Sequence, residues 1–170
     1  LSGVANQGCD IGGFDGPLPE PELFVRWVQN GIFQPRFSIH SCNTDNTVTE
    51  PWTYPTYTHY IRDAIKLRYS LVPYFYSLLY EAATVGSPIM RPLVYDFQAD
   101  PRVAEESFEF MLGPALLVAN VVEPQQTSKA IYLPKGARWF DLHNHQYYDG
   151  GQTITVPVDL GSIPMFLRSG

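Results

Sequence analysis

Charged residues are scarce in this 170-residue chain. They make up 16% of it, against about 25% in typical soluble domains. Its 11 basic residues form no run, and 17 acidic residues leave a formal net charge of −6. Neutralising a phosphate backbone needs clustered Lys and Arg. The composition therefore argues against a nucleic-acid partner.

Long apolar runs, cysteine pairs and two common catalytic motifs are also missing. Crossing a bilayer takes about 20 apolar residues, and every apolar run here is far shorter, so we expect no membrane-spanning helix. Two cysteines, Cys9 and Cys42, make neither a disulfide framework nor a paired metal motif, and the compartment stays undecided. No Gly-x-Ser-x-Gly elbow and no phosphate-cradling Gly-Lys-Ser/Thr loop occurs, which leaves hydrolases and kinases of those classes unsupported.

The chain instead contains enough apolar surface for a folded core, with 45% hydrophobic and 14% aromatic residues. It begins at Leu1 with neither an initiator Met nor a signal-peptide pattern. We interpret this start as a cut end.

Two compositions meet in the chain, and we place the domain boundary between residues 96 and 97. In residues 1–96 the pattern predicts a short strand over Gly3–Asn6, a helix from about Glu20 to Asn30 and an extended run over Ile32–His40. A long helix follows from about Thr56 to Thr84, apolar on almost every face. Within it Pro73 should kink or split the helix, and Gly86 should end it.

Residues 97–170 show short β-like runs separated by turns, which predicts an antiparallel β-domain. The expected strands are 116–122, 129–133, 138–141, 153–158 and 163–167.

The first part cannot close a core by itself. Its alternation of strand and helix is typical of the last units of a (β/α)8 barrel or another α/β sheet whose earlier units are absent. The predicted fold class is therefore α/β plus all-β, with the end of a barrel before an antiparallel β-sandwich. Ligand-contacting residues of barrels lie at the carboxyl ends of the strands, which brings the 10–14 and 36–40 segments to one rim.

Four side chains at this rim are candidates for a site. Asp10 precedes two glycines and either faces a polar ligand or accepts backbone hydrogen bonds in a turn, and the turn is the commoner case. Phe14 is either a platform for a sugar ring or a core residue. His40 ends an extended run, where an imidazole can donate to a substrate hydroxyl. Arg36 is either a carboxylate partner or a loop-tethering residue.

Two further groups favour structural explanations. In a strand, Asp141, His143 and His145 would share one face and form a three-ligand metal site, but Asn144 indicates a polar hairpin turn. The aromatic loop with Trp52, Tyr54 and Tyr57 either stacks on sugars or packs at the start of a helix.

Several segments, taken together and in order, closely resemble glycoside hydrolase family 31, the α-glucosidase and α-xylosidase family. The end of that family's barrel is matched by Gly8–Phe14, Glu22–Phe33 and His40. Its following β-sandwich is matched by Met90–Leu93, Phe110–Ala119, Tyr132–Pro134 and Ile163–Gly170.

The resemblance implies a retaining α-glycosidase that acts on terminal α-linked glucosides or related glycosides without a metal or organic cofactor. Phe14 and His40 would line the subsite of the reacting sugar, His40 would bond its hydroxyls, and Asp10 would support the pocket. Many members carry an Arg two residues before the histidine, where this chain has Ser38. The substrate subclass therefore stays open.

The resemblance also implies that the catalytic carboxylates lie outside this chain. The family's nucleophile belongs to a Trp-x-Asp-Met-Asn-Glu type segment and its acid to a Gly-Asp-Asn type segment, and neither string occurs. We therefore expect the chain to be inactive alone and to need the missing N-terminal part of the same enzyme. The apolar long helix also predicts self-association. The alternative function is a non-catalytic carbohydrate-binding or interaction module.

Overall fold

The computed structural model describes residues 3–169, and its contacts divide them into two compact units, one up to Ile89 and one from Met90 onward. The chain start at Leu1 and the final residue of the Ile163–Gly170 segment lie outside the described residues. None of the described helices is both long and apolar enough to span a membrane.

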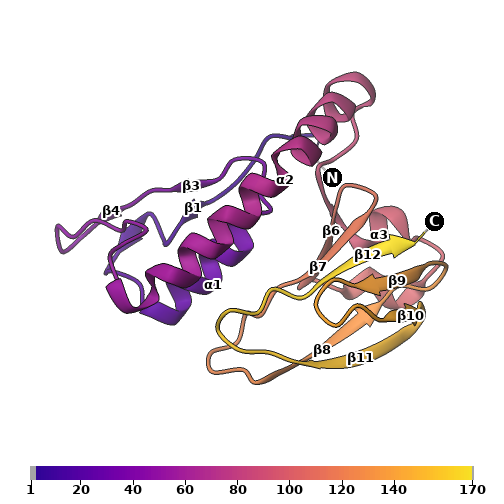
Figure 1. The fold of residues 1–170 in the computed structure, drawn as a ribbon. Helices are drawn as coiled ribbons and strands as arrows, with labels where there is room; N and C mark the ends of the chain where they lie inside the picture. Colours follow the sequence, from indigo (N-terminus) through magenta and orange to yellow (C-terminus); the bar gives the residue numbers. More distant parts are fainter. Residues whose placement is uncertain (1–2, 170) are drawn as a thin grey trace. The chain divides into compact units, whose positions relative to one another are not determined.

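The first unit is built on a parallel strand–helix–strand arrangement (Figure 1). Strands β1 and β3 pair in parallel, with Asp10 opposite Ser38 and Ile11 opposite Ile39. Further along, β2 and β4 pair in parallel as well. In chain order the elements are β1 (Asp10–Ile11), β2 (Asp15–Gly16), α1 (Pro21–Gly31), β3 (Ser38–Ile39), β4 (Cys42–Asn43), the 3-10 helix η1 (Pro55–Tyr57) and α2 (Thr58–Val85).

Helix α1 confirms the predicted first helix. It begins at Pro21, where a missing N–H costs nothing because the first helical N–H groups have no partner. Phe24 and Val28 are fully buried. At its end, a Cβ on Gly31 would lie 2.2 Å from Cδ1 of Ile11. Glycine is therefore required where the helix passes β1.

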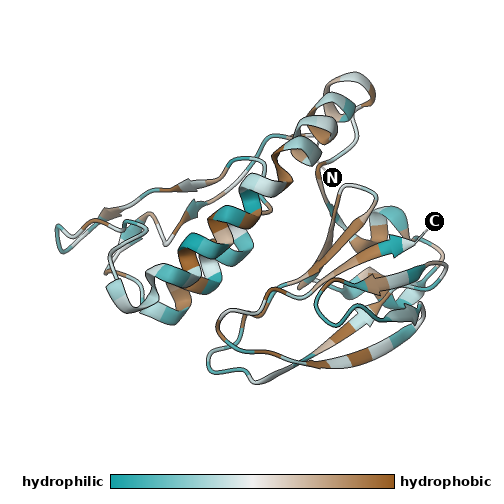
Figure 2. Ribbon diagram, in the orientation of Figure 1, coloured by the Kyte–Doolittle hydropathy of each residue, from teal (hydrophilic) through white to brown (hydrophobic). Residues whose placement is uncertain are grey.

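Helix α2 confirms the long helix and its end at Gly86, which has a left-handed φ of 75°. We expected Pro73 to kink or split the helix; it lies inside one continuous helix, so the split does not occur. The loss of about 3 kcal/mol at an internal proline is outweighed because α2 buries side chains on both sides of Pro73, Ile61 and Ala64 before it and Phe75 and Leu78 after it. Figure 2 shows hydrophobic residues recurring along both α1 and α2.

Arg68 ties α2 to the turn that follows α1. Its Nη1 donates to the carbonyls of Ile32 (2.7 Å) and Gln34 (2.5 Å), and its Nη2 donates to that of Pro35 (2.9 Å). The guanidinium also lies 4.3 Å from the ring centre of Phe75. Carbonyls just beyond a helix lack helical partners, so this one cation satisfies them and fixes the path of the chain into β3.

The second unit is an antiparallel β-domain, as predicted. Its six-stranded sheet has the order β10-β9-β12-β7-β6-β5, and β11 pairs with β8 in a separate two-stranded sheet. The predicted strands correspond to β7 (Leu116–Ala119), β8 (Ser128–Leu133), β9 (Arg138–Asp141), β11 (Gln152–Pro157) and β12 (Met165–Ser169). Sequence analysis missed β5 (Met90–Pro92), β6 (Glu109–Leu112), β10 (Tyr147–Asp149), the short helix α3 (Leu93–Asp96) and the 3-10 helix η2 (Pro101–Glu105).

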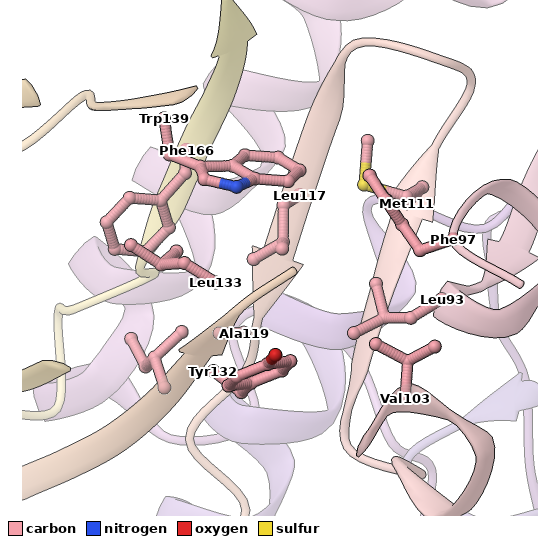
Figure 3. Packing of buried hydrophobic residues seen from close by; sticks show 11 residues of the cluster. Leu93, Phe97, Val103, Met111, Leu117, Ala119, Tyr132, Leu133, Trp139 and Phe166 are labelled. Carbon is pink, nitrogen blue, oxygen red and sulfur yellow. The ribbon is translucent and has the colours of Figure 1, made fainter. Parts of the chain in front are cut away.

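One hydrophobic cluster joins the two sheets of this unit (Figure 3). Trp139 at its centre is fully buried, packs 5.7 Å from the ring of Phe97 and donates its indole N–H to the carbonyl of Pro134 (3.1 Å). Side chains from the six-stranded sheet, from β8 and from α3 and η2 complete the cluster, which is the arrangement of a sandwich. Its labelled members include Leu93, Val103, Met111, Leu117, Ala119, Tyr132, Leu133 and Phe166.

The contacts change units at Met90, whereas the composition indicated a boundary between residues 96 and 97. The intervening residues associate with the second unit because Met90 pairs with Leu112 across β5 and β6. Leu93 is part of the buried cluster, and Arg91 forms a 3.2 Å ion pair with Asp96.

Two buried carboxylates bind the edge of β8 that faces away from β11. The Tyr132 N–H donates to Glu109 Oε1 (2.9 Å), and Asp100 Oδ2 accepts from the Tyr132 hydroxyl (2.7 Å) and the Lys135 N–H (2.8 Å). Glu109 Oε2 is buried and has no hydrogen-bond partner among the described residues. Glu109 thus satisfies a backbone N–H of β8 that a neighbouring strand would otherwise bind, and Asp100 holds the Tyr132 side chain and the turn just after β8.

The pKa of Glu109 is raised to about 7, chiefly by burial and to a smaller extent by the charge of Glu106. The Tyr132 N–H and the cations of Lys129 and Arg102 act in the lowering direction, but burial dominates. The folded chain therefore holds a proton on Glu109 more tightly than the unfolded chain does.

We predict that Glu109→Gln flattens the pH dependence of stability. The pKa of Glu109 in the folded chain lies above the ordinary 4.5. Its protonation therefore contributes fully to the free energy of unfolding below about pH 4.5, and this contribution of about 3 kcal/mol is lost as the pH rises through 7. Burial raises the pKa of Asp100, but hydrogen bonds outweigh it and the net pKa is lowered, so Asp100 acts only in more acidic solution.

The measurement is denaturant unfolding between about pH 5 and 8, followed by Trp139 fluorescence in a chain carrying Trp27→Phe and Trp52→Phe. The free energy of unfolding should fall with pH in the parent chain and much less in the Glu109→Gln variant, which keeps an acceptor for the Tyr132 N–H. Equal slopes in the two chains would contradict the assignment.

A second prediction concerns the exposed face of α2. Tyr69 and Tyr76 are 74% and 77% exposed, and Val72 and Tyr80 continue the same face at helical spacing. Such a stripe favours association, so we expect concentration-dependent self-association of the 170-residue chain. The double change Tyr69→Lys and Tyr76→Lys should reduce it.

Sedimentation velocity with an apolar dye measures this association. The matched control is Ser70→Lys with Ser77→Lys, on the exposed polar face of the same helix, which should leave association unchanged. A monodisperse monomer that binds no dye would show the prediction to be wrong.

Candidate functional site

The candidate site lies where β1 and β3 end. The loop Gly12–Phe14 follows β1, the residues His40 and Ser41 follow β3, and each loop leads into one strand of the second parallel pair. The Cys42 N–H donates to the carbonyl of Phe14, and the two loops run beside each other. Segments far apart in sequence are thereby brought to one rim, as expected.

Phe14 and His40 meet at this rim. Their ring centres are 5.3 Å apart, with the planes inclined by 50°. Phe14 is 49% exposed and His40 is exposed as well, so Phe14 is not a core residue of this structure. Together the two rings form an open surface with an aromatic face and an imidazole.

The paired glycines allow the loop to turn under this surface. Gly12 and Gly13 have φ values of 94° and 84°, a region that residues with a Cβ rarely adopt. A Cβ on Gly12 would also lie 2.9 Å from Cγ2 of Thr49 and 3.1 Å from the ring of Phe24. The tight turn predicted at this position is confirmed.

Asp10 occupies a different place from the one that the sequence predicted. The strand expected over Gly3–Asn6 does not form, and Val4 is 65% exposed. Strand β1 instead begins at Asp10, because pairing requires a partner and β3 lies opposite Asp10–Ile11. Asp10 is therefore a strand residue at the base of the rim, not the first residue after a strand.

Arg36 fills both of the roles left open for it, because it is the carboxylate partner of Asp10 and also tethers the loop before β1. Its Nη2 lies 2.8 Å from Asp10 Oδ1, and its Nη1 donates to the carbonyl of Gly8 at 3.2 Å. Among residues 3–169 the Asp10 side chain accepts this side-chain bond and none of the backbone bonds of a turn-forming aspartate.

Cys9, Trp27 and Gln34 also support the rim, and sequence analysis did not identify them as a group. The Trp27 indole N–H donates to Cys9 Sγ (3.2 Å). The side-chain amide of Gln34 makes two bonds to Cys9. Its Oε1 accepts from the backbone N–H of Cys9 (2.8 Å), and its Nε2 donates to Sγ (3.4 Å). No spacing in the sequence indicates these contacts, because the residues come from three separate elements.

The aromatic loop packs at the start of α2. Tyr54 donates its hydroxyl to the carbonyl of Pro19 and lies edge-on to Phe24 and Tyr57, with ring centres 6.3 and 6.5 Å away. Trp52 is exposed and lines an apolar groove of about 500 Å³ along the first half of α2.

The Asp141–His145 segment forms a turn. Strand β9 ends at Asp141, whose Oδ1 accepts the N–H groups of His143 (2.7 Å) and Asn144 (3.4 Å). His145 has a left-handed φ of 59° and stacks on Phe140. Within residues 3–169 no three His, Cys, Asp or Glu side chains are grouped so as to hold a metal ion.

The first unit is a parallel strand–helix–strand unit that carries polar and aromatic side chains at the carboxyl ends of its strands. In the chain it is followed by a long helix and an antiparallel sandwich, and this combination defines a class of protein. It is the class of barrel enzymes with an appended β-domain. Residues 1–78 match the model of the glycosyl hydrolases family 31 TIM-barrel domain, and residues 86–170 match that of the family's C-terminal domain. The chain belongs to glycoside hydrolase family 31, and the predicted fold class is confirmed.

Known relatives are similar over the whole chain. Neutral alpha-glucosidase AB of Sus scrofa is 45% identical and a probable glucan 1,3-alpha-glucosidase of Oryza sativa subsp. japonica is 43% identical, each over 100% of this chain. The chain spans only 18% of the length of each relative.

Solved structures are similar as well. A GH31 alpha-xylosidase from a soil metagenome, complexed with xylose, has a TM-score of 0.89 and 31% identity, over 98% of this chain and 28% of its own. A Flavobacterium johnsoniae GH31 dextranase, complexed with glucose, has a TM-score of 0.90 and 37% identity, over 98% of this chain and 21% of its own.

Proposed function

We propose that this chain supplies the sugar-binding rim of a longer retaining α-glycosidase that hydrolyses terminal α-linked glucosides or related glycosides. The observation that carries the proposal is the meeting of Phe14 and His40 at the carboxyl ends of neighbouring parallel strands. The relatives support it, since they are named as alpha-glucosidases, and similar structures hold xylose or glucose.

Each rim residue has a role that its chemistry suits. The exposed ring of Phe14 offers an apolar face to the C–H face of a pyranose. The imidazole of His40 donates to a sugar hydroxyl. Asp10, held by Arg36 below them, supports the pocket.

The bond-breaking groups come from outside this chain in our proposal. Retaining hydrolysis needs two carboxyl groups about 5 to 5.5 Å apart, one to attack the anomeric carbon and one to protonate the leaving oxygen. Neither segment type that carries them occurs in these 170 residues. Since carboxyl groups perform both steps, the proposal includes no metal and no organic cofactor.

A non-catalytic carbohydrate-binding module is the alternative. The parallel pairing of β1 with β3 around α1 favours the glycosidase, because a free-standing binding module needs no barrel-end loop. An antiparallel β-domain alone would have been compatible with either function.

We predict that the 170-residue chain alone does not hydrolyse aryl α-glycosides. Loss of even one member of a catalytic set costs several orders of magnitude in rate. The measurement is release of the aryl group by the purified chain. The Phe14→Ala variant, purified in parallel, shows how much of that release comes from contaminating host glycosidases. Turnover that survives this control would contradict the proposal.

We also predict that His40→Ala lowers kcat/KM of the full-length enzyme by roughly ten- to a hundredfold. One hydrogen bond of a charged or polarised donor is worth about 1.5 to 3 kcal/mol. Because the bond tightens as the sugar ring flattens in the transition state, kcat should fall more than KM rises.

The matched control is His59→Ala, an exposed histidine on α2 away from the rim. Steady-state kinetics and a melting curve on both variants separate the roles. An unchanged kcat/KM with a lowered melting temperature in His40→Ala would make His40 a loop-anchoring residue and remove it from the sugar site.

A further inference from the structure

The paired strands β1 and β3 have two faces that carry different side chains. Ile11, paired with Ile39, faces α1, where it closely approaches Gly31. The opposite face holds Asp10 with Ser38 beside it. Arg36 contacts Asp10 on that face, and His40 contacts Phe14 beyond it. The face that carries the rim therefore has an ion pair at its base.

Arg36 is joined to the start of β1 by both its main chain and its side chain. The Arg36 N–H donates to the carbonyl of Gln7 (3.0 Å), and a Cβ on Gly8 would lie 1.9 Å from the carbonyl oxygen of Arg36. Its guanidinium spans Gly8 O and Asp10 Oδ1. A planar fork can hold two acceptors in fixed directions, which an ammonium group cannot do.

The ion pair engages only one oxygen of Asp10. Oδ1 accepts from Arg36, whereas Oδ2 has no hydrogen-bond partner among the described residues. Ser38, directly opposite, makes no side-chain hydrogen bond to Asp10 within residues 3–169. Asp10 and Arg36 are 30% and 44% exposed in this chain, so the ion pair is only partly buried.

We infer that Arg36 is a positioning residue of the sugar site, which orients Asp10 so that Oδ2 accepts a hydroxyl of the bound sugar. The inference rests on the proposed function for its ligand, a neutral pyranose. A carboxylate with one oxygen held by a cation is pre-organised to accept from a hydroxyl, and no side-chain entropy is lost on binding. Arg36 acts through Asp10 and does not itself touch the sugar.

A double-mutant cycle in the full-length enzyme tests this dependence. Arg36→Met and Asp10→Asn should each lower kcat/KM by roughly ten- to thirtyfold, and the double variant should be no worse than the more severe single variant. Arg36→Lys, which keeps the charge but not the fork, should lose roughly threefold. The matched control Arg62→Met, on exposed α2 surface, should change nothing.

Losses that multiply independently in the double variant would overturn the inference. So would an Arg36→Met enzyme with kcat/KM within about twofold of the parent and a lowered melting temperature, since that is the signature of a purely structural arginine. Should Arg36→Met fail to fold, the cycle is run with Arg36→Lys, and the same comparison of single and double variants decides.

A second readout separates this inference from the proposed function. In NMR spectra of the 170-residue chain carrying Tyr69→Lys and Tyr76→Lys to suppress association, Arg36→Lys should shift the ring resonances of Phe14 and His40, and Arg62→Lys should not. Unmoved rings would overturn the positioning role whatever the enzyme does. If the ring resonances shift but the full-length enzyme hydrolyses no α-glycoside, only the proposed function is contradicted.

Discussion

The parallel pairing of β1 with β3 is the constraint on which the candidate site depends. Only two residue pairs form it, Asp10 with Ser38 and Ile11 with Ile39, yet a slip of one residue would turn Asp10 towards α1 and the isoleucines towards the rim. The register is fixed from outside the strands. Ile11 fits against the bare backbone of Gly31, and Arg68 holds the carbonyls of the turn that leads into β3. Helix packing thus sets the position of the side chains at the rim.

The second unit is stabilised differently, by apolar burial and by carboxylates. Its two sheets share one cluster that includes Trp139, while Glu109 accepts a backbone N–H of β8 and Asp100 accepts that of Lys135, just after the strand. Buried carboxylates stay in place only when they are hydrogen-bonded or protonated, and burial raises the pKa of Glu109, whose Oε2 has no hydrogen-bond partner among the described residues. A side chain of β6 therefore takes the place of a neighbouring strand at Tyr132, and the residue that caps η2 holds the turn after β8.

Periodicity and turn chemistry predicted the elements that are long or well punctuated. Helix α1 after Pro21, α2 up to Gly86 and the paired glycines at Gly12 all follow from local rules. The short strands β1 and β5 were not predicted from the sequence, because they form by pairing with a partner strand and their own residues show no strand pattern. The strand-end rule brought the Asp10 and His40 segments together, but the finding that Arg36 both pairs with Asp10 and tethers the preceding loop required the direction of its side chain, which no sequence pattern records.

The central claim is that the Phe14 and His40 rim binds the reacting sugar. The most direct test is a crystal structure of the full-length enzyme, with its nucleophile replaced, in complex with an α-glucoside. We expect a pyranose against the ring of Phe14, with one hydroxyl about 2.7 to 3.2 Å from a nitrogen of His40. A sugar bound productively elsewhere, with His40 contacting only protein, would contradict it.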